Sequence, residues 1–319
     1  MKWKKLGKIF DPQEHMPFNG SAGFAQSPQA LVFDDFVRIY FSTREKDPES
    51  GKYCSNIAFA DFDKQFKKVL RMSDTEVIAP GNLGCFDEHG IFPMNVLRHK
   101  DKVFAWTCGW NRRVSVSVDT AIGFAVSIDD GLSFRRNGEG PVMASTLNEP
   151  FLVGDPFVNY FGGAFHMWYI FGQRWIIKDP DSPAERVYKI AHASSDDGVN
   201  WERDGKPVIT DRLGEDECQA LPTVIFAGAK YHMYFCYRFS EGFRTVREKG
   251  YRLGYATSED LVNWTRNDDK AGIDVSDTGW DSDMQCYPHL FWCDGNVYLL
   301  YNGNEFGRHG FGLAVLESL

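Results

Sequence analysis

The chain has 319 residues, and its 43% hydrophobic, 25% charged and 15% aromatic content indicates a folded globular protein rather than a disordered one. The 44 acidic and 35 basic residues give a formal net charge of -9, which argues against nucleic acid or an anionic membrane as a partner. Seven cysteines without metal-ligand spacing and an N-terminus without a long apolar segment predict reduced thiols, no metal, no cofactor and a cytoplasmic location.

One strand pattern recurs along the chain at intervals of 62 to 66 residues. A first apolar strand begins at a proline in each copy, at Pro28, Pro93, Pro156, Pro222 and Pro288. A second strand follows after a short turn, from Val37, Val103, Phe165, Tyr231 and Val297. A third strand begins at Ile57, Ile122, Ile190, Leu253 and Phe311. Each copy therefore contains at least three consecutive antiparallel strands.

A fourth strand starts with an aromatic residue and basic residues, as in Phe66-Lys67-Lys68, Phe134-Arg135-Arg136, Trp201-Glu202-Arg203 and Trp264-Thr265-Arg266. The last copy ends without one, but Trp3-Lys4-Lys5 at the N-terminus fits the same pattern. The N-terminal strand is therefore expected to complete the last copy and close a ring. The sequence predicts an all-β fold, a five-bladed β-propeller with four antiparallel strands per blade, as a single domain over residues 1–319.

Three acidic turns separate third and fourth strands. Residues 127–134 and 194–201 share the pattern SxDxGxx(F/W), and residues 258–264 form a shorter version. We interpret Asp and Gly as turn residues and the aromatic residue as packing between blades, in preference to a metal or catalytic signature.

Two residue sets are expected to meet at one end of the central channel, termed the mouth, because the second strand runs antiparallel to the first. The set before the first strands is mainly acidic and contains Asp87, Glu88, His89, Asp155, Glu215, Asp216, Glu217, Asp281 and Asp283. The set that ends the second strands contains Arg44, Trp110, Asn111, Arg174, Arg238 and Asn304. Carboxylates, amides, guanidinium groups and indoles together suit a saccharide ligand.

The repeat, the SEDLVNW turn at 258–264, Gly154-Asp155-Pro156 and Glu217-Cys218 resemble the five-bladed propeller glycosidase superfamily. This superfamily includes arabinanases, β-xylosidases, invertase-like fructosidases and mannoside phosphorylases, and the resemblance extends over essentially the whole chain. It implies that Asp155 contacts substrate hydroxyls or orients the acid, and that Glu217 is the general acid.

The chain departs from the hydrolases at the first blade, where residues 19–28 contain no carboxylate although a hydrolase normally has an Asp there. The usual two-carboxylate hydrolysis is therefore in doubt. A phosphorylase does not need that base, because phosphate is the nucleophile. Cationic groups would hold phosphate or a phosphorylated sugar, and the candidates are Arg44, Arg174, Arg238, Arg308 and His309.

The leading hypothesis is an enzyme that hydrolyses, phosphorolyses or transfers a glycosyl unit. Its catalytic candidates are Glu217, Asp155, Glu88, Asp87 and Asp283, and its substrate-binding candidates are Arg44, Trp110, Asn111, Arg174, Arg238, Asn304 and His89. Alternatively, these carboxylates cap turns or pair with arginines, and the chain is a non-catalytic propeller that binds a glycan or a nucleotide sugar. A sialidase-like enzyme is a third hypothesis, but five repeats rather than six argue against it.

Overall fold

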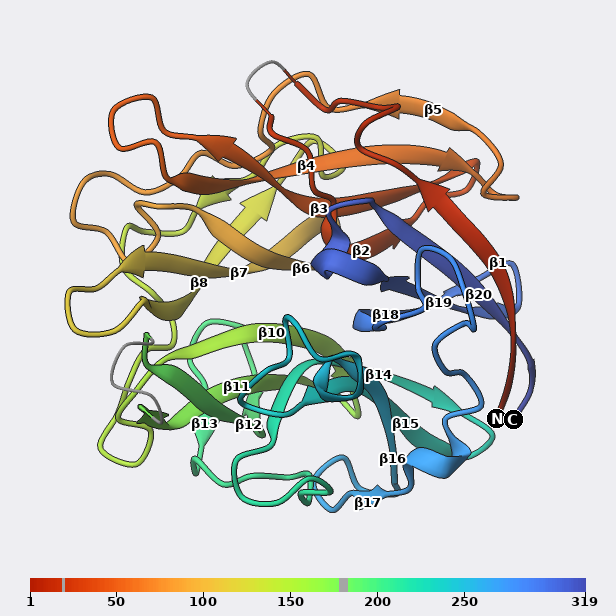
Figure 1. Ribbon diagram of the computed structural model, residues 1–319. Helices are drawn as coiled ribbons and strands as arrows, with labels where there is room; N and C mark the ends of the chain where they lie inside the picture. The colour runs from red at the N-terminus through yellow and green to blue at the C-terminus, as the bar shows by residue number, and fades with distance from the viewer. Residues whose placement is uncertain (19–20, 178–182) are drawn as a thin grey trace.

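The computed structural model describes residues 1–18, 21–177 and 183–319, which form five four-stranded antiparallel sheets (Figure 1). The first strand of each sheet contacts the first strands of the two neighbouring sheets, so β2, β6, β10, β14 and β18 form a closed inner ring. The predicted five-bladed propeller is confirmed.

The blades follow the chain in order, and their strands match the predicted repeat. The first blade consists of β2 (Gln26–Val32), β3 (Phe36–Lys46), β4 (Tyr53–Asp63) and β5 (Val69–Met72). The second consists of β6 (Ile91–His99), β7 (Lys102–Arg112), β8 (Val118–Ser127) and β9 (Arg135–Arg136). The third consists of β10 (Val153–Phe161), β11 (Ala164–Ile176), β12 (Glu185–Ser195) and β13 (Glu202–Arg203).

The last two blades complete the ring. The fourth consists of β14 (Cys218–Ala227), β15 (Lys230–Arg238), β16 (Arg252–Ser258) and β17 (Thr265–Arg266). The fifth consists of β18 (Cys286–Cys293), β19 (Asn296–Asn302), β20 (Phe311–Ser318) and β1 (Lys2–Phe10). The 3₁₀ segments in the described ranges are η1 (Arg247–Lys249), η2 (Asp268–Lys270) and η3 (Asn304–Gly307).

The two ends of the chain close the ring as predicted. Strand β1 pairs antiparallel with β20, with Trp3 opposite Leu316, and the termini lie side by side (Figure 1). The Trp3 indole also reaches the fourth blade, where its Nε1 donates a hydrogen bond of 2.8 Å to Tyr234 Oη. The N-terminal strand therefore completes the fifth blade by pairing with its third strand. Its Trp3 side chain also connects the fifth blade to the fourth.

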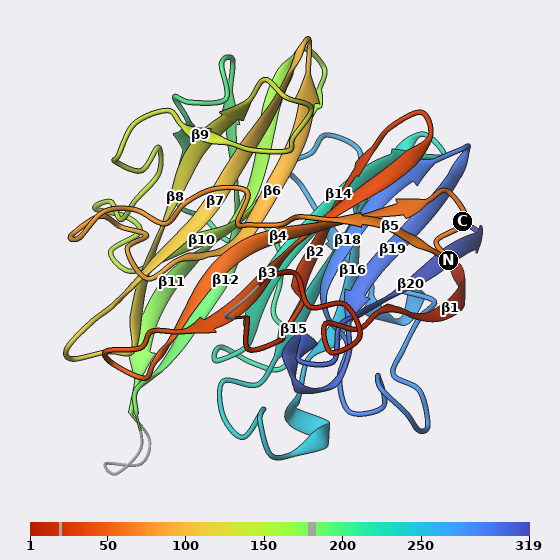
Figure 2. The same ribbon diagram turned by 90° about the horizontal axis from the view of Figure 1, so that it is seen from above.

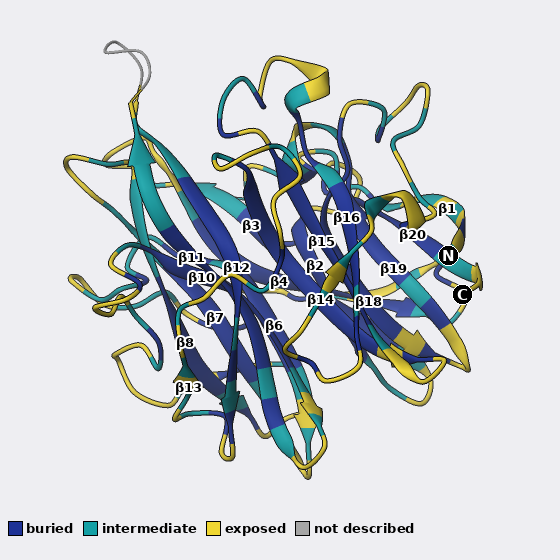
Figure 3. Cartoon of the chain, turned by 90° about the horizontal axis from the view of Figure 1, so that it is seen from below, coloured by how far each residue is buried: buried dark blue, intermediate teal, exposed yellow. Residues whose placement is uncertain are grey.

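The aromatic residue before each fourth strand packs against the preceding blade, as the sequence predicts. Trp201 lies 6.2 Å from Trp106 between ring centroids, and Trp264 lies 5.9 Å from Trp168. The equivalent contacts elsewhere are Phe134 with Tyr40, Trp3 with Tyr234, and Phe66 with Phe291. Each edge-on pair buries apolar surface between two sheets. Figure 3 shows that the middle parts of most strands are buried.

The acidic turns have the structural role that the sequence predicts. The Asp197 carboxylate accepts hydrogen bonds of 2.8 Å from the backbone N–H groups of Val199 and Asn200, which hold its pKa well below the usual range. The next residue, Gly198, has φ +76 and its carbonyl accepts a hydrogen bond from Trp106 Nε1. The motif therefore shapes the turn and joins it to the preceding blade.

One predicted register is wrong, because β5 begins at Val69 rather than at Phe66-Lys67-Lys68. In this register Met72 faces Ala60 of β4. The residues at the equivalent position in the other blades are all basic, and they are Arg136, Arg203, Arg266 and Lys5 opposite Ala125, Ala193, Ala256 and Ala314. The first blade thus differs from the others at one defined position of its outer strand.

No helix among the described residues is long and apolar enough to span a bilayer. All seven cysteines are free thiols.

Removing the Trp3 side chain tests how far closure stabilises the ring. We expect Trp3→Ala to lower the free energy of unfolding by about 3–5 kcal/mol, the usual cost of deleting a buried indole. Urea unfolding followed by tryptophan fluorescence measures the change. Leu6→Ala on the same strand is the control, because Leu6 is 43% exposed, and it should change stability by less than about 1 kcal/mol. Equal losses in both variants would contradict a specific role of Trp3.

Candidate functional site

Each first strand carries a bulge at a residue that precedes a proline. These residues are Ser27, Phe92, Asp155, Leu221 and Tyr287, and the strand register shifts around each of them. All except Phe92, whose bond to Pro93 is cis, have a positive φ between 48° and 56°. Such angles are uncommon for residues other than glycine, and they gather where a ligand site requires a special side-chain direction. Asp155 is the one charged residue in this ring of five.

A cavity of about 690 Å³ lies beside this ring and is lined by side chains of all five blades. Phe92, Asp155 and Tyr287 are part of its wall. Its wall also includes Gln26, Arg44, Trp110, Arg186, Tyr188, Arg238, Phe243, Arg244, Tyr251, Glu305 and Phe306. The volume suits a ligand of one or two sugar rings. Figure 2 shows the loops that project beyond the ends of the strands.

Asp155 is the buried carboxyl of this cavity. Its side chain belongs to β10, and only 8% of the residue surface is exposed. Burial raises the pKa of Asp155 to about 7, although the positive charge of Arg186 and a backbone hydrogen bond from Leu221 oppose that rise. A carboxyl with such a pKa is protonated in about half of the molecules at pH 7, so it can give up and regain a proton near neutral pH.

The cavity wall is rich in arginine although the whole chain carries a net charge of -9. Arg44, Arg186, Arg238 and Arg244 line it, while its carboxylates are Asp155 and Glu305. Glu305 lies 3.1 Å from Arg308 and 3.2 Å from His309, so its charge is already compensated. The local potential therefore favours an anionic ligand.

Arg44 has no carboxylate partner among the described residues. Its Nε donates to Gln26 Oε1 at 2.8 Å and its Nη1 donates to Ser55 Oγ at 2.5 Å. The same Ser55 hydroxyl accepts a hydrogen bond from Trp110 Nε1, and the guanidinium lies 5.3 Å from the centre of the Phe92 ring. These contacts fix Arg44 in place beside a tryptophan while leaving its charge uncompensated.

The structure places Asp155, Arg44, Trp110 and Arg238, four of the predicted site residues, on the wall of this cavity. The remaining candidates lie outside the cavity wall. They are Glu217, Asp87, Glu88, Asp283, Asn111, Arg174, Asn304 and His89.

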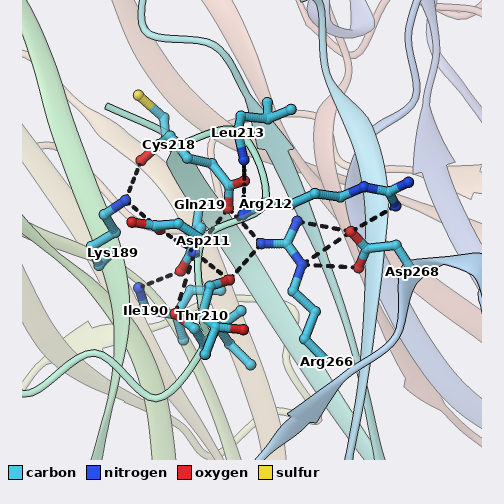
Figure 4. Close-up of polar contacts among 12 residues, drawn as sticks. Lys189, Ile190, Thr210, Asp211, Arg212, Leu213, Cys218, Gln219, Arg266 and Asp268 are labelled. Carbon is cyan, nitrogen blue, oxygen red and sulfur yellow. Dashed lines mark hydrogen bonds and ion pairs between the residues drawn. The ribbon is translucent and has the colours of Figure 1, made fainter. Parts of the chain in front are cut away.

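Glu217 is fully buried and lies outside the cavity wall, and both of its carboxylate oxygens accept hydrogen bonds. Its carboxylate accepts hydrogen bonds from Arg266 Nη1 at 2.6 Å, from Gln219 Nε2 at 2.9 Å, and from the backbone N–H groups of Arg212 and Leu213. Figure 4 shows Arg266 held between Thr210 on one side and Asp268 on the other. The Glu217 carboxylate therefore forms a buried ion pair with Arg266.

The same ion pair recurs in the other blades. A buried carboxylate from the loop before a first strand meets the basic residue that faces the third-strand alanine, in the pairs Asp87 with Arg136, Glu149 with Arg203, and Asp281 with Lys5. The first blade has Met72 at the basic position, and residues 19–28 contain no carboxylate, although 19 and 20 lie outside the described residues.

Both members of this recurring ion pair are thus absent from the first blade. Burying either charge alone would be costly, so a blade carries both members of the pair or neither. The first blade thus lacks the carboxylate, and Met72 occupies the position of its basic partner.

The other candidates form local contacts at the rim. Glu88 accepts a hydrogen bond from the Gly84 backbone at 2.7 Å, and Arg174 contacts Asp216 at 2.5 Å. Asn304 accepts hydrogen bonds from the backbone N–H groups of Asp283 and Met284. His89 stacks on Trp110 at 5.7 Å, and burial lowers its pKa.

The cavity wall also contains four residues that were not predicted from the sequence, namely Arg186, Tyr188, Tyr251 and Tyr287. Arg186 and Tyr188 lie at the start of a third strand, which begins at the same mouth where the second strand ends. Tyr287 precedes a proline in the position that Asp155 has in the third blade. The start of a third strand and the position before a proline can both be located from the strand repeat.

No family model matches the chain. Two proteins of Mycobacterium tuberculosis, Uncharacterized protein Rv1502 and Uncharacterized protein MT1551, are each 35% identical over 321 residues, which cover 100% of this chain and 100% of each relative. The chain belongs to the family of these two proteins.

A shorter similarity extends to Beta-1,2-mannobiose phosphorylase of Thermoanaerobacter sp., which is 29% identical over 111 residues, or 34% of this chain and 35% of that protein. Among solved structures, one described as "Glycoside hydrolase" has a TM-score of 0.73 at 17% identity, covering 99% of this chain and 92% of the other. Another, described as "The GH130 family of mannoside phosphorylases contains glycoside hydrolases that target beta-1,2 mannosidic linkages in Candida mannan", has a TM-score of 0.69 at 14% identity, covering 98% of this chain and 93% of the other. The chain shares its fold with these five-bladed propellers, which confirms the resemblance in architecture.

The repeated ion pair predicts strong coupling between its two members. Asp87→Asn and Arg136→Met should each lower the free energy of unfolding, because each leaves one buried charged group without its partner. The double variant restores the neutral arrangement of the first blade and should lose less than the two single losses combined. Urea unfolding of the four proteins measures this coupling, which we expect to be about 1–3 kcal/mol. Additive losses would contradict the pairing.

The raised pKa of Asp155 predicts a pH-dependent cost to folding. The folded protein holds this proton up to pH about 7, whereas the unfolded chain releases it near pH 4. The contribution of Asp155 to the free energy of unfolding is therefore present at low pH and is lost as the pH rises from about 4 to about 7. Asp155→Asn removes the effect, so the variant should gain stability relative to wild type across that range, measured by urea unfolding at several pH values. A constant difference between the two proteins would contradict the raised pKa.

Proposed function

We propose that this protein is a carbohydrate-active enzyme that cleaves a glycosidic bond with phosphate as the acceptor. The observation that carries the proposal is a buried carboxyl, that of Asp155, in a cavity whose other charges are mainly arginines. Burial raises the pKa of this carboxyl to about 7. The similarity to Beta-1,2-mannobiose phosphorylase over 111 residues supports this class of reaction.

The proposed step uses Asp155 as the proton donor. As the bond between the anomeric carbon and the bridging oxygen breaks, Asp155 gives its proton to that oxygen and becomes a carboxylate. A phosphate oxygen forms the new bond to the anomeric carbon, so the products are a sugar 1-phosphate and the released saccharide. Asp155 regains a proton from solvent. Burial favours the protonated form of this donor before the reaction.

Arg44 is the proposed ligand for the attacking phosphate. It belongs to the first blade and Asp155 to the third, and these blades are not neighbours in the ring. A nucleophile on one side of the cavity and a proton donor on another suit attack on the sugar face opposite the leaving oxygen. The neutral partners of Arg44 leave its charge available for phosphate. Trp110, whose indole is fixed through Ser55, supplies a flat surface for a pyranose ring.

Phosphorolysis fits the cavity better than hydrolysis. Hydrolysis generally needs a second carboxylate to activate water or to attack the anomeric carbon. The second carboxylate of the described cavity wall is Glu305, and its oxygens contact Arg308 and His309. The alternative of a propeller that binds a glycan or nucleotide sugar without converting it stays a prediction, and the test below separates the two.

Turnover by Asp155 variants tests the proposal. The protein is incubated with phosphate and a panel of disaccharides, and sugar 1-phosphate formation is measured. We expect Asp155→Asn to lower turnover at least about a hundredfold, the usual contribution of a general acid. The wild-type rate should fall as pH rises through about 7, because Asp155 then loses its proton.

Glu217→Gln is the matched control, since Glu217 is a buried carboxylate outside the cavity wall. It should lose stability while the folded protein keeps near-normal turnover. Full activity of Asp155→Asn, or loss of activity in the folded Glu217→Gln protein, would contradict the assignment of the proton donor. Saccharide binding without any product would favour the non-catalytic alternative.

A further inference from the structure

Arg238 is a second uncompensated positive charge in the cavity. It ends β15 in the fourth blade, and only 2% of its surface is exposed. Its Nη1 donates to the Phe239 carbonyl at 2.8 Å and its Nη2 donates to Tyr188 Oη at 3.0 Å, while Nε has no partner. It has no carboxylate partner within the described ranges. A buried guanidinium without a counter-charge is unfavourable unless a ligand supplies one.

Aromatic rings hold Arg238 in a fixed direction. The guanidinium carbon lies 3.5 Å from the centre of the Phe243 ring and 5.5 Å from those of Tyr188 and Tyr251. The Tyr188 and Tyr251 hydroxyls are 2.8 Å apart and form a hydrogen-bonded pair on the cavity wall. A preorganised arginine with two adjacent hydroxyls is a suitable receptor for the oxygens of an anionic group.

The surroundings of Arg238 are separate from those of Arg44. Arg44 contacts Gln26, Ser55 and Phe92 of the first and second blades, whereas Arg238 contacts residues of the third and fourth blades. The first and fourth blades are not neighbours in the ring. The cavity therefore offers two receptors for anions, while phosphorolysis of a neutral saccharide requires one.

We propose that Arg238 binds an anionic group carried by the saccharide itself, so that the substrate is a sugar phosphate or a uronic acid glycoside. This inference rests on the proposed function, in which Arg44 binds the attacking phosphate. A neutral sugar would leave the buried charge of Arg238 without a counter-charge, whereas an anionic group would supply one, so the site would favour the anionic substrate. Phosphate ester and carboxylate share the required chemistry, an anionic oxygen group beside the sugar ring.

Titration calorimetry with inorganic phosphate tests the number of anion sites directly. We expect wild type to bind two equivalents of phosphate per chain. Arg238→Gln should retain the site at Arg44 and bind one equivalent, and Arg44→Gln should retain the site at Arg238 and also bind one. Asp155→Asn should still bind two, since this variant removes the proton donor and neither arginine.

Saccharide probes then identify the second anion. Hexose 6-phosphates and hexuronates should bind Arg238→Gln roughly ten- to a hundredfold more weakly than wild type, the usual effect of losing a charged hydrogen bond. The matching neutral hexoses should bind both proteins equally. Stronger binding of hexose 6-phosphates identifies a phosphate ester as the natural group, and stronger binding of hexuronates identifies a carboxylate.

Arg238→Lys keeps the proposal testable if the glutamine variant does not fold. Lysine retains the charge but not the planar donor pair, so it should weaken phosphate binding in the same direction. One equivalent of phosphate in wild type, unaffected by either Arg238 variant and lost in Arg44→Gln, would overturn the second site while leaving phosphorolysis intact. No effect of Arg44→Gln on phosphate binding would instead contradict the proposed function.

Discussion

The structure depends on the antiparallel pairing of β1 with β20, which converts a row of sheets into a ring. Because the first and fifth blades then become neighbours, β2 and β18 can contact each other and the inner ring has no gap. The cavity is lined by all five blades, so it exists only when the ring is closed. A strand taken from the N-terminus thus brings together side chains as far apart in the chain as Phe24 and Phe306.

Charged residues in this fold divide according to whether they have a partner. Carboxylates such as Glu217 and Asp281 are buried against a basic residue of the outer strand, and their pairs connect the two edges of a blade. Arg44 and Arg238 lack a carboxylate partner in the described structure although neither is exposed. Since an unpaired buried charge is costly, its persistence points to a ligand, whereas a paired charge is explained by the fold.

The backbone is unusual at one position of each first strand. The bulges before the prolines give Asp155 and Tyr287, like Ser27 and Leu221, a left-handed conformation that β-strand residues normally avoid. A similar bulge is present in every blade, so it is part of the propeller, and the side chain at that position distinguishes one blade from another.

The sequence by itself determined the number of blades, the order of strands, the closure by Trp3 and the presence of Asp155 and arginines near one mouth. These conclusions follow from a period and a strand direction, which are local properties repeated along the chain. Only the tertiary structure separated Asp155, on the cavity wall, from Glu217, which is buried against Arg266, because both lie near the start of a first strand and differ in what surrounds them. It also showed Met72 in place of a basic residue and added Arg186 and Tyr287 to the cavity. Pairing and burial depend on distances between blades, and no single repeat contains that information.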